Sequence, residues 1–320
     1  MPESKKEVSE LSESQKEEVD FVDALSKSSD GKTAEKLIKE KLDWGKSDIV
    51  AKNFSKIAEK VKDSNKLNWY VDRIESDWNL KSLSTSINSL KSTAVIRNIM
   101  KKVSSSNDSE VVKEFSKSTK VETINSMDSS DAKNYINNVD KFGCLQNIAN
   151  WFSKIENKEV FKTAVEKVND SQDSKVVTEF SKNTSASAIN KMEPNNALWF
   201  IQKVAEKWDI NCLASKIKNI SNKEISKNIV NAVAEKGNPV ALKSISKDID
   251  ASVIKTMDSK DLHTFARKSL MKGWPDCAIA MAWNKELMKH LDEGTSSLVK
   301  EYAENANAEK VLEKGLKQLD

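Results

Sequence analysis

The 320-residue sequence is poor in the residues that make turns and strands. It contains seven Gly and four Pro, far too few for a β-rich or loop-rich protein, because tight turns depend on these two residues. No apolar run approaches the ~20 residues that span a membrane, and the purest one is AIAMAW at 278–283. We therefore expect an all-α fold without a membrane span.

Cysteine is also scarce. Cys144, Cys212 and Cys277 form no CxxC pair, and their odd number fits neither a disulfide framework nor a zinc site. We expect them to be small residues buried at repeat junctions. The first twenty residues lack the apolar core of a secretion signal. Without such a signal, we expect a cytoplasmic protein.

Arginine is nearly absent, since Arg73, Arg97 and Arg267 are its only occurrences and lysine carries almost all the positive charge. This scarcity disfavours bidentate recognition of phosphates or bases, in which the guanidinium fork matters most. The net charge of +3 combines −4 over residues 1–20 with +7 over the rest. The acidic start has the low hydrophobicity and high charge of disordered segments, so we expect residues 1–17 to be a disordered acidic tail.

No signature of an active site occurs in the chain. The sequence contains no GxGxxG, Walker, GxSxG or HExxH motif. His263 and His290 are isolated, whereas metal and catalytic sites need clustered partners. We therefore expect no catalytic residue, no metal, no cofactor and no small-molecule substrate, and a protein that is not an enzyme.

What the sequence does contain is an internal repeat. The phrase SEVVKEFSK at 109–117 returns as SKVVTEFSK at 174–182, a shift of 65 residues. The same shift relates three further sets, which are Ile124, Ile189 and Ile254; Met127, Met192 and Met257; and Tyr135, Phe200 and Phe265. A repeat of this size in a chain so poor in turn residues predicts stacked helices with one continuous core.

Each 65-residue unit is predicted to hold two helical hairpins. Apolar markers followed two places later by a helix-starting residue alternate at spacings of 37 and 28 residues, at Leu90, Met127, Ile155, Met192, Ile220 and Met257. We expect the helix starts to be capped by Ser92, Ser129, Asn157, Asn222 and Ser259, with Pro194 in the remaining copy.

Behind each start, apolar residues recur at helical spacing and should be buried. One class of helix has these positions at Val160, Ala164, Val165 and Val168 and again at Ile225, Ile229, Val230 and Val233. The other class has them at Ala197, Phe200, Ile201 and Val204, and the same register catches Leu67, Tyr70, Val71 and Ile74, although residues 55–62 have lost four residues relative to 116–127.

Hairpin length and apolar spacing over residues ~30–290 resemble the HEAT and armadillo class of α-solenoids. The resemblance implies an elongated right-handed solenoid of stacked helical hairpins, with a double hairpin of about 65 residues as its repeat. We assign residues 18–46 to an N-terminal helical cap, 47–283 to the hairpin repeats, and 284–320 to a C-terminal cap of about three helices.

The resemblance supplies no catalytic residue and implies a binding scaffold. Together with the missing chemistry, it predicts a non-enzymatic interaction scaffold that binds a protein partner or assembles into a larger complex through the solenoid surface. The alternative is a nucleic-acid-binding HEAT-like protein, including the alkyl-base DNA glycosylase type, which would use a basic concave face. The abundant lysine allows this alternative and the scarce arginine weakens it.

An aromatic residue ends one helix of every unit, at Trp78, Phe142, Trp208 and Trp274, with Trp44 at a similar place in the cap. Aromatic residues that recur with a fold are more often packing residues than ligand platforms, so we expect a packing ladder.

Trp69 and Trp199 lie two units apart in a register that should face solvent. Asn134 and Thr264 hold the same register in the other copies. Two interpretations stay open, because a neighbouring helix could cover both rings or the rings could bind a partner. We predict that Trp69 and Trp199 anchor a partner, since exposed large apolar residues often mark interfaces.

Overall fold

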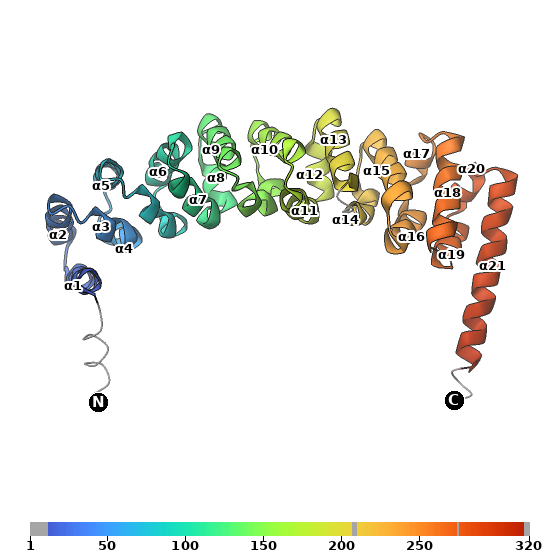
Figure 1. The fold of residues 1–320 in the computed structure, drawn as a ribbon, viewed down its shortest axis with the longest axis horizontal. Coiled ribbons are helices and arrows are strands. Elements are labelled where there is room, and N and C mark those ends of the chain that lie inside the picture. The colour runs from blue at the N-terminus through green and yellow to red at the C-terminus, as the bar shows by residue number, and fades with distance from the viewer. Residues whose placement is uncertain (1–11, 207–209, 274, 317–320) are drawn as a thin grey trace. The chain divides into compact units, whose positions relative to one another are not determined.

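The computed structural model describes residues 12–206, 210–273 and 275–316, with only the backbone described for 308–316. These residues form α-helices and short 3-10 helices, with no strand among them (Figure 1). The predicted all-α class is therefore confirmed. None of the described helices is long and apolar enough to cross a membrane.

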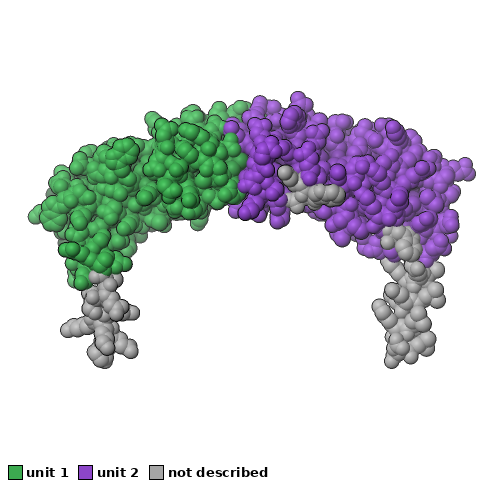
Figure 2. Space-filling model, viewed as in Figure 1, with its two compact units in different colours: residues 1–148, 155–160 green, residues 149–154, 161–320 purple. Residues whose placement is uncertain are grey.

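Contacts within the chain define two compact units, residues 1–148 with 155–160 and residues 149–154 with 161–320 (Figure 2). The first will be called unit 1 and the second unit 2. Helix α10 (Lys158–Asp170) has its first three residues in unit 1 and the others in unit 2.

Unit 1 contains nine further α-helices and three 3-10 helices among its described residues. They are α1 (Glu13–Lys27), α2 (Gly31–Asp43), α3 (Ser47–Lys52), α4 (Phe54–Lys60), α5 (Ser64–Ser76), η2 (Leu80–Thr85), η3 (Ile87–Ser89), α6 (Thr93–Ser105), α7 (Ser109–Ser118), α8 (Val121–Ser126), α9 (Ser129–Lys141) and η4 (Leu145–Asn147). Helix α6 packs against α5 and α9, and α7 packs against η2.

In unit 2, the described residues contain α-helices α11 to α21 and two 3-10 helices. They are η5 (Ala149–Lys154), α11 (Ser174–Asn183), α12 (Ala186–Lys191), α13 (Pro194–Glu206), α14 (Asn211–Ala214), η6 (Ile217–Asn219), α15 (Lys223–Lys236), α16 (Pro239–Asp248), α17 (Ala251–Ile254), α18 (Ser259–Gly273), α19 (Asp276–Trp283), α20 (Lys285–His290) and α21 (Glu293–Leu316). Helix α13 packs against α15, and α19 against α16 and α21.

Helix boundaries recur along the chain. Helices α5, α9, α13 and α18 begin at residues 64, 129, 194 and 259, which are 65 residues apart. Helices α6, α10 and α15 begin at 93, 158 and 223, again 65 residues apart. All sixteen apolar positions predicted to be buried are buried, none with more than 3% of its surface exposed. The helical period of the sequence therefore locates the core correctly.

The predicted helix caps are correct where the residue is Asn. The Asn157 side chain accepts from the backbone N–H groups of Glu159 and Val160 at 3.0 and 3.2 Å, and Asn222 does the same for α15. Ser92 is at the N-cap of α6 but makes no side-chain cap bond.

The two predicted serine caps Ser129 and Ser259 lie one residue inside their helices. In α18, Asp258 instead accepts from the N–H of Asp261 at 2.8 Å. The aspartate before each serine takes the cap position, since aspartate suits an N-cap as well as serine does, although Asp128 makes no side-chain cap bond to α9.

Both ends of the chain differ from the predicted boundaries. Helix α1 begins at Glu13, inside the segment assigned to the acidic tail, because Ser12 and Gln15 form a capping box there. Residues 1–11 lie outside the described residues. At the other end, residues 284–316 form two helices, α20 and α21, rather than about three. No Gly or Pro interrupts residues 295–314, so the segment stays one helix.

Candidate partner-binding residues

Trp69 projects from helix α5 in unit 1. Its neighbours Leu67, Tyr70 and Val71 are buried, which fixes the face that α5 turns to the core and leaves Trp69 on the opposite side. The Trp69 ring is 47% exposed, makes an edge contact with Tyr70 at 5.5 Å, and has the Lys39 Nζ 5.9 Å from its centroid. The ring is therefore half covered by its own unit and otherwise open.

Trp199 occupies the same place in helix α13 of unit 2 and is 60% exposed. The next residue, Phe200, is fully buried and packs edge-on against Phe180 with ring centroids 5.0 Å apart. Neither Trp69 nor Trp199 is buried within its unit, so the interpretation that a neighbouring helix covers both rings is wrong. Asn134, at the same register of α9, is exposed as well.

The predicted packing ladder is wrong at the three aromatic positions that the structure describes, because none of the three side chains is buried. Trp44 is 67% exposed and Trp78 is 85% exposed, while Phe142 is partly exposed with the Lys141 Nζ 5.0 Å from its ring. Trp208 and Trp274 lie outside the described residues. Trp44, Trp78 and Phe142 are exposed because each follows the last turn of its helix, where the chain has left the periodic apolar stripe.

The turn after these helices is the same in α2, α5 and α9. In α5 the N–H of Asn79 donates to the Ile74 carbonyl at 3.0 Å, and the N–H of Trp78 donates to the Glu75 carbonyl at 2.9 Å. This bond pair is a Schellman motif, which ends a helix through one residue in the left-handed conformation. Bonds in the same positions follow α2 and α9.

Trp78 occupies the position in this motif that normally requires glycine. The left-handed residue is Gly45 after α2 (φ 71°) and Gly143 after α9 (φ 67°), but Trp78 after α5 (φ 61°). Among the described residues, Trp78 is the only non-glycine with a positive φ. An L-residue in this conformation costs roughly 1–2 kcal/mol relative to the right-handed one. Because the side chain is so exposed, burial does not offset that cost.

A cleft of about 580 Å³ opens beside Trp78 in unit 1. Leu80 and Val111 are almost fully buried and form apolar parts of its lining, while Glu75 and Asp108 contribute carboxylates. Lys102 also lines the cleft.

Lys102 is held in place by two carboxylates of α5. Its Nζ lies 3.0 Å from the Asp72 carboxylate and also forms an ion pair with Glu75. Burial lowers the pKa of Lys102, but its hydrogen bonds to Glu75 and Asp72 outweigh this effect, so the pKa lies above its usual value. Lys102 therefore stays charged and is already neutralised by its own unit.

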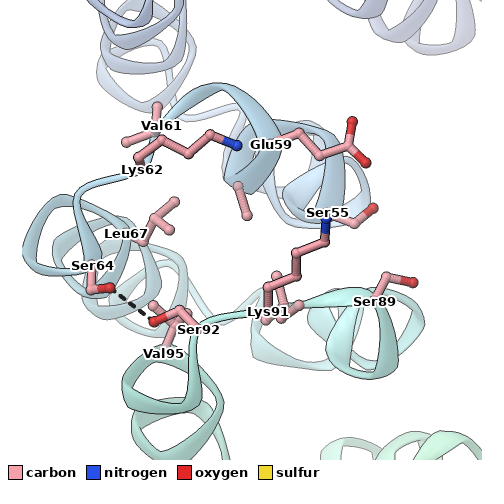
Figure 3. A pocket seen from close by; sticks show the side chains of 12 residues that line it. Ser55, Glu59, Val61, Lys62, Ser64, Leu67, Ser89, Lys91, Ser92 and Val95 are labelled. Atoms are coloured by element: carbon pink, nitrogen blue, oxygen red, sulfur yellow. Dashed lines mark hydrogen bonds between the residues drawn. The ribbon is translucent and has the colours of Figure 1, made fainter.

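A second cleft, of about 380 Å³, lies at the N-terminal ends of α5 and α6. Figure 3 shows Ser64 and Ser92 hydrogen-bonded in it, with their Oγ atoms 2.8 Å apart. Lys62 and Lys91 also line this cleft. The Ser92 hydroxyl is engaged with Ser64, which explains why it does not cap α6.

The following copy closes the equivalent turn with asparagine. There Asn125 accepts from the N–H of Glu156 at 3.1 Å, and Asn157 caps α10. In unit 2, Asn190 accepts from the N–H of Ser221 at 2.9 Å. Residues 55–62 of the first copy, four fewer than the matching segment 116–127, contain no asparagine.

The two histidines, for which the sequence predicts no catalytic or metal-binding role, make hydrogen bonds to the backbone. His263 Nε2 lies 2.9 Å from the backbone N of Asp292, just before α21, and His290 Nδ1 lies 3.0 Å from the Glu286 carbonyl. Cys144 and Cys277 are buried as predicted, while Cys212 is only partly so. Across residues 12–206, 210–273 and 275–307, no group of three His, Cys, Asp or Glu side chains could hold a metal ion.

Comparisons with protein-family models, with curated proteins and with solved structures gave no match to this chain.

Proposed function

We propose that this chain is a non-enzymatic scaffold, a right-handed solenoid of stacked helical hairpins that binds a protein partner or assembles into a larger complex through its surface. The 65-residue spacing of the helix starts supports a double-hairpin repeat. Solenoids of this kind bind along extended surfaces, because each repeat contacts only its neighbours and leaves a continuous face free.

The observation that carries the proposal is the exposure of Trp69 and Trp199. Tryptophan is the residue most enriched among those that dominate binding energy at protein interfaces. In this register the fold does not require it, because Asn134 in α9 occupies the same place on the outer side of its helix. The two rings therefore provide apolar area that only a partner can bury.

Ion pairs between neighbouring elements support a protein partner over nucleic acid. Lys66 pairs with Glu35 at 2.7 Å in unit 1, and Lys243 pairs with Asp276 at 2.9 Å in unit 2. Arg97 pairs with Asp128 at 3.8 Å. Such pairs neutralise basic groups that phosphate binding would need.

The test is a quantitative comparison of binding and stability. The chain is used to capture partners from its native host, the partners are identified by mass spectrometry, and the purified partner is titrated against Trp69→Ala and Trp199→Ala. Each variant should lose affinity by ~2 kcal/mol or more, about 30-fold, with little change in melting temperature.

Asn134→Ala and Thr264→Ala are matched controls, because they alter the same register in the copies without tryptophan. Both should keep wild-type affinity. If the tryptophan variants instead lose ~3–5 kcal/mol of stability without a specific binding defect, they are core residues and the proposal fails. Binding to duplex DNA or RNA that weakens steeply with salt, with no protein captured, would favour nucleic-acid binding instead.

A further inference from the structure

We infer that Trp78 and the cleft beside it bind an arginine side chain in an extended segment of the partner. This inference rests on the proposed scaffold function and names the chemistry of one contact. Its residues are distinct from Trp69 and Trp199, so the two proposals can fail separately.

The fold does not require a tryptophan at position 78. The same Schellman turn follows α2 and α9 with Gly45 and Gly143 in the left-handed position. Trp78 adopts this conformation at φ 61° and leaves 85% of its surface exposed. A backbone outlier whose side chain gains no burial indicates a role outside folding.

Among the described residues no cation lies over the Trp78 ring, unlike the rings of the other exposed tryptophans of unit 1, Trp44 and Trp69. The Lys41 Nζ lies 5.4 Å from the Trp44 ring, and the Lys39 Nζ lies 5.9 Å from the Trp69 ring. In the part of the chain that the structure describes, no such cation faces Trp78. Tryptophan is the strongest aromatic acceptor for a cation placed over its face.

The charges that line the cleft favour a cation. Its lining has two carboxylates, Glu75 and Asp108, against the single ammonium of Lys102. Lys102 is already bound by Glu75 and Asp72. A chain whose body is basic overall is therefore locally acidic here, which favours a cationic occupant and disfavours phosphate or nucleic acid.

Arginine fits the Trp78 ring and the cleft better than lysine does. A guanidinium group stacks on an aromatic face and can hydrogen-bond to a carboxylate at the same time, whereas an ammonium is a compact, strongly hydrated charge. Leu80 and Val111 offer apolar surface for the aliphatic stem. A cleft of about 580 Å³ has room for a long side chain and its flanking backbone.

The test is a titration of the full chain, labelled with ¹⁵N, with the acetylated and amidated peptide Gly-Arg-Gly. The Trp78 indole signal is assigned by its absence in Trp78→Gly. It should shift saturably with the arginine peptide, more weakly with Gly-Lys-Gly, and not with Gly-Glu-Gly or Gly-Leu-Gly. Trp78→Gly should weaken arginine binding about 3- to 30-fold. Glu75→Gln should also weaken arginine binding, and added salt should reduce the affinity of this variant less than that of the wild type.

Trp44→Ala is the matched control, because it removes an exposed tryptophan from the same unit whose ring already has Lys41 beside it. It should leave arginine binding unchanged. Trp78→Gly should melt at or above the wild-type temperature, and a lower melting temperature would assign Trp78 to folding and overturn the inference. Equal shifts of all indole signals, or equal shifts with the leucine peptide, would also overturn it.

The failures are distinguishable. If a captured partner depends on Trp69 and Trp199 but the arginine titration shows no saturable shift, only the arginine site is wrong. If arginine binds at Trp78 but no partner depends on Trp69 or Trp199, the scaffold proposal as stated is wrong.

Discussion

Asn138 offers a sharp test of how neighbouring helices are joined in unit 1. It is buried on α9, and its Nδ2 donates to the carbonyls of Ser106, Ser104 and Val103 at 2.7, 3.3 and 3.4 Å. These carbonyls lie at the C-terminal end of α6, where carbonyls lack their regular helical partner, and the Val103 carbonyl also accepts from the Ser106 N–H at 3.2 Å. One side chain of α9 thus hydrogen-bonds to carbonyls at the end of α6.

Asn138→Ala should therefore destabilise the protein. Removing the donor takes this partner from the Ser106 and Ser104 carbonyls, while the Val103 carbonyl still accepts from the Ser106 N–H. The loss costs ~1–3 kcal/mol, and the shortest bond, to Ser106, accounts for most of it. Alanine is the better helix former by about 0.5 kcal/mol, which offsets a small part of the loss. Asn137→Ala has the same gain in helix propensity, and Asn137 is exposed on the same helix. The difference between the two variants isolates the buried hydrogen bonds.

The assay is thermal and urea unfolding of the full chain, with hydrogen exchange of α6 and α9 amides to locate the loss, because two compact units need not unfold in one step. The melting temperature should fall by about 2–4 °C per kcal/mol. Asn137→Ala should be neutral or slightly stabilising. If the two variants agree within ~0.3 kcal/mol, the bonds to α6 contribute no net stability and the reasoning is refuted.

Two further predictions concern buried titratable groups. Burial, followed by the nearby Asp276 carboxylate, raises the pKa of Cys277 to about 12; iodoacetamide at pH 8 should therefore label Cys212 well before Cys277, and equal rates by peptide mass spectrometry would contradict this. Burial raises the pKa of Tyr70 from 10.0 to about 12, so the unfolded state loses this proton first and the free energy of unfolding should fall between pH 10 and 12. Tyr70→Phe should make that fall less steep, as measured by urea unfolding across this range.

The parts of the fold that could be predicted from the sequence are those set by helical periodicity. Val160, Ile225 and Phe200 are buried where their spacing places them, because an amphipathic helix has one stripe that must leave water. Asn157 and Asn222 cap their helices because their side chains reach the first free amides. Both features depend on residues within one or two turns, which is the range over which a sequence pattern is informative.

The features that periodicity missed lie where the helix ends. Trp78 looked like part of a packing ladder because it follows a helix, yet a shift of 65 residues places it opposite Gly143 rather than Phe142. Gly143 and Gly45 carried the missing signal, since glycine just past a helix marks the left-handed position of a Schellman turn. The predicted Ser92 cap failed for another reason. The Ser92 hydroxyl is hydrogen-bonded to Ser64, which is 28 residues away in the chain, and no local sequence pattern predicts this contact.

The copies differ at exposed positions where the fold does not require a large ring, and we propose that these positions recognise the partner. At the outer register of the helices, Trp69 and Trp199 alternate with Asn134 and Thr264. At the left-handed turn, Trp78 replaces the glycine that the backbone favours. A residue that every copy shares is explained by packing, whereas a large ring that only some copies carry at an exposed or unfavourable position is not. Departures between copies, rather than the shared pattern, are therefore the residues by which this protein should select its partner.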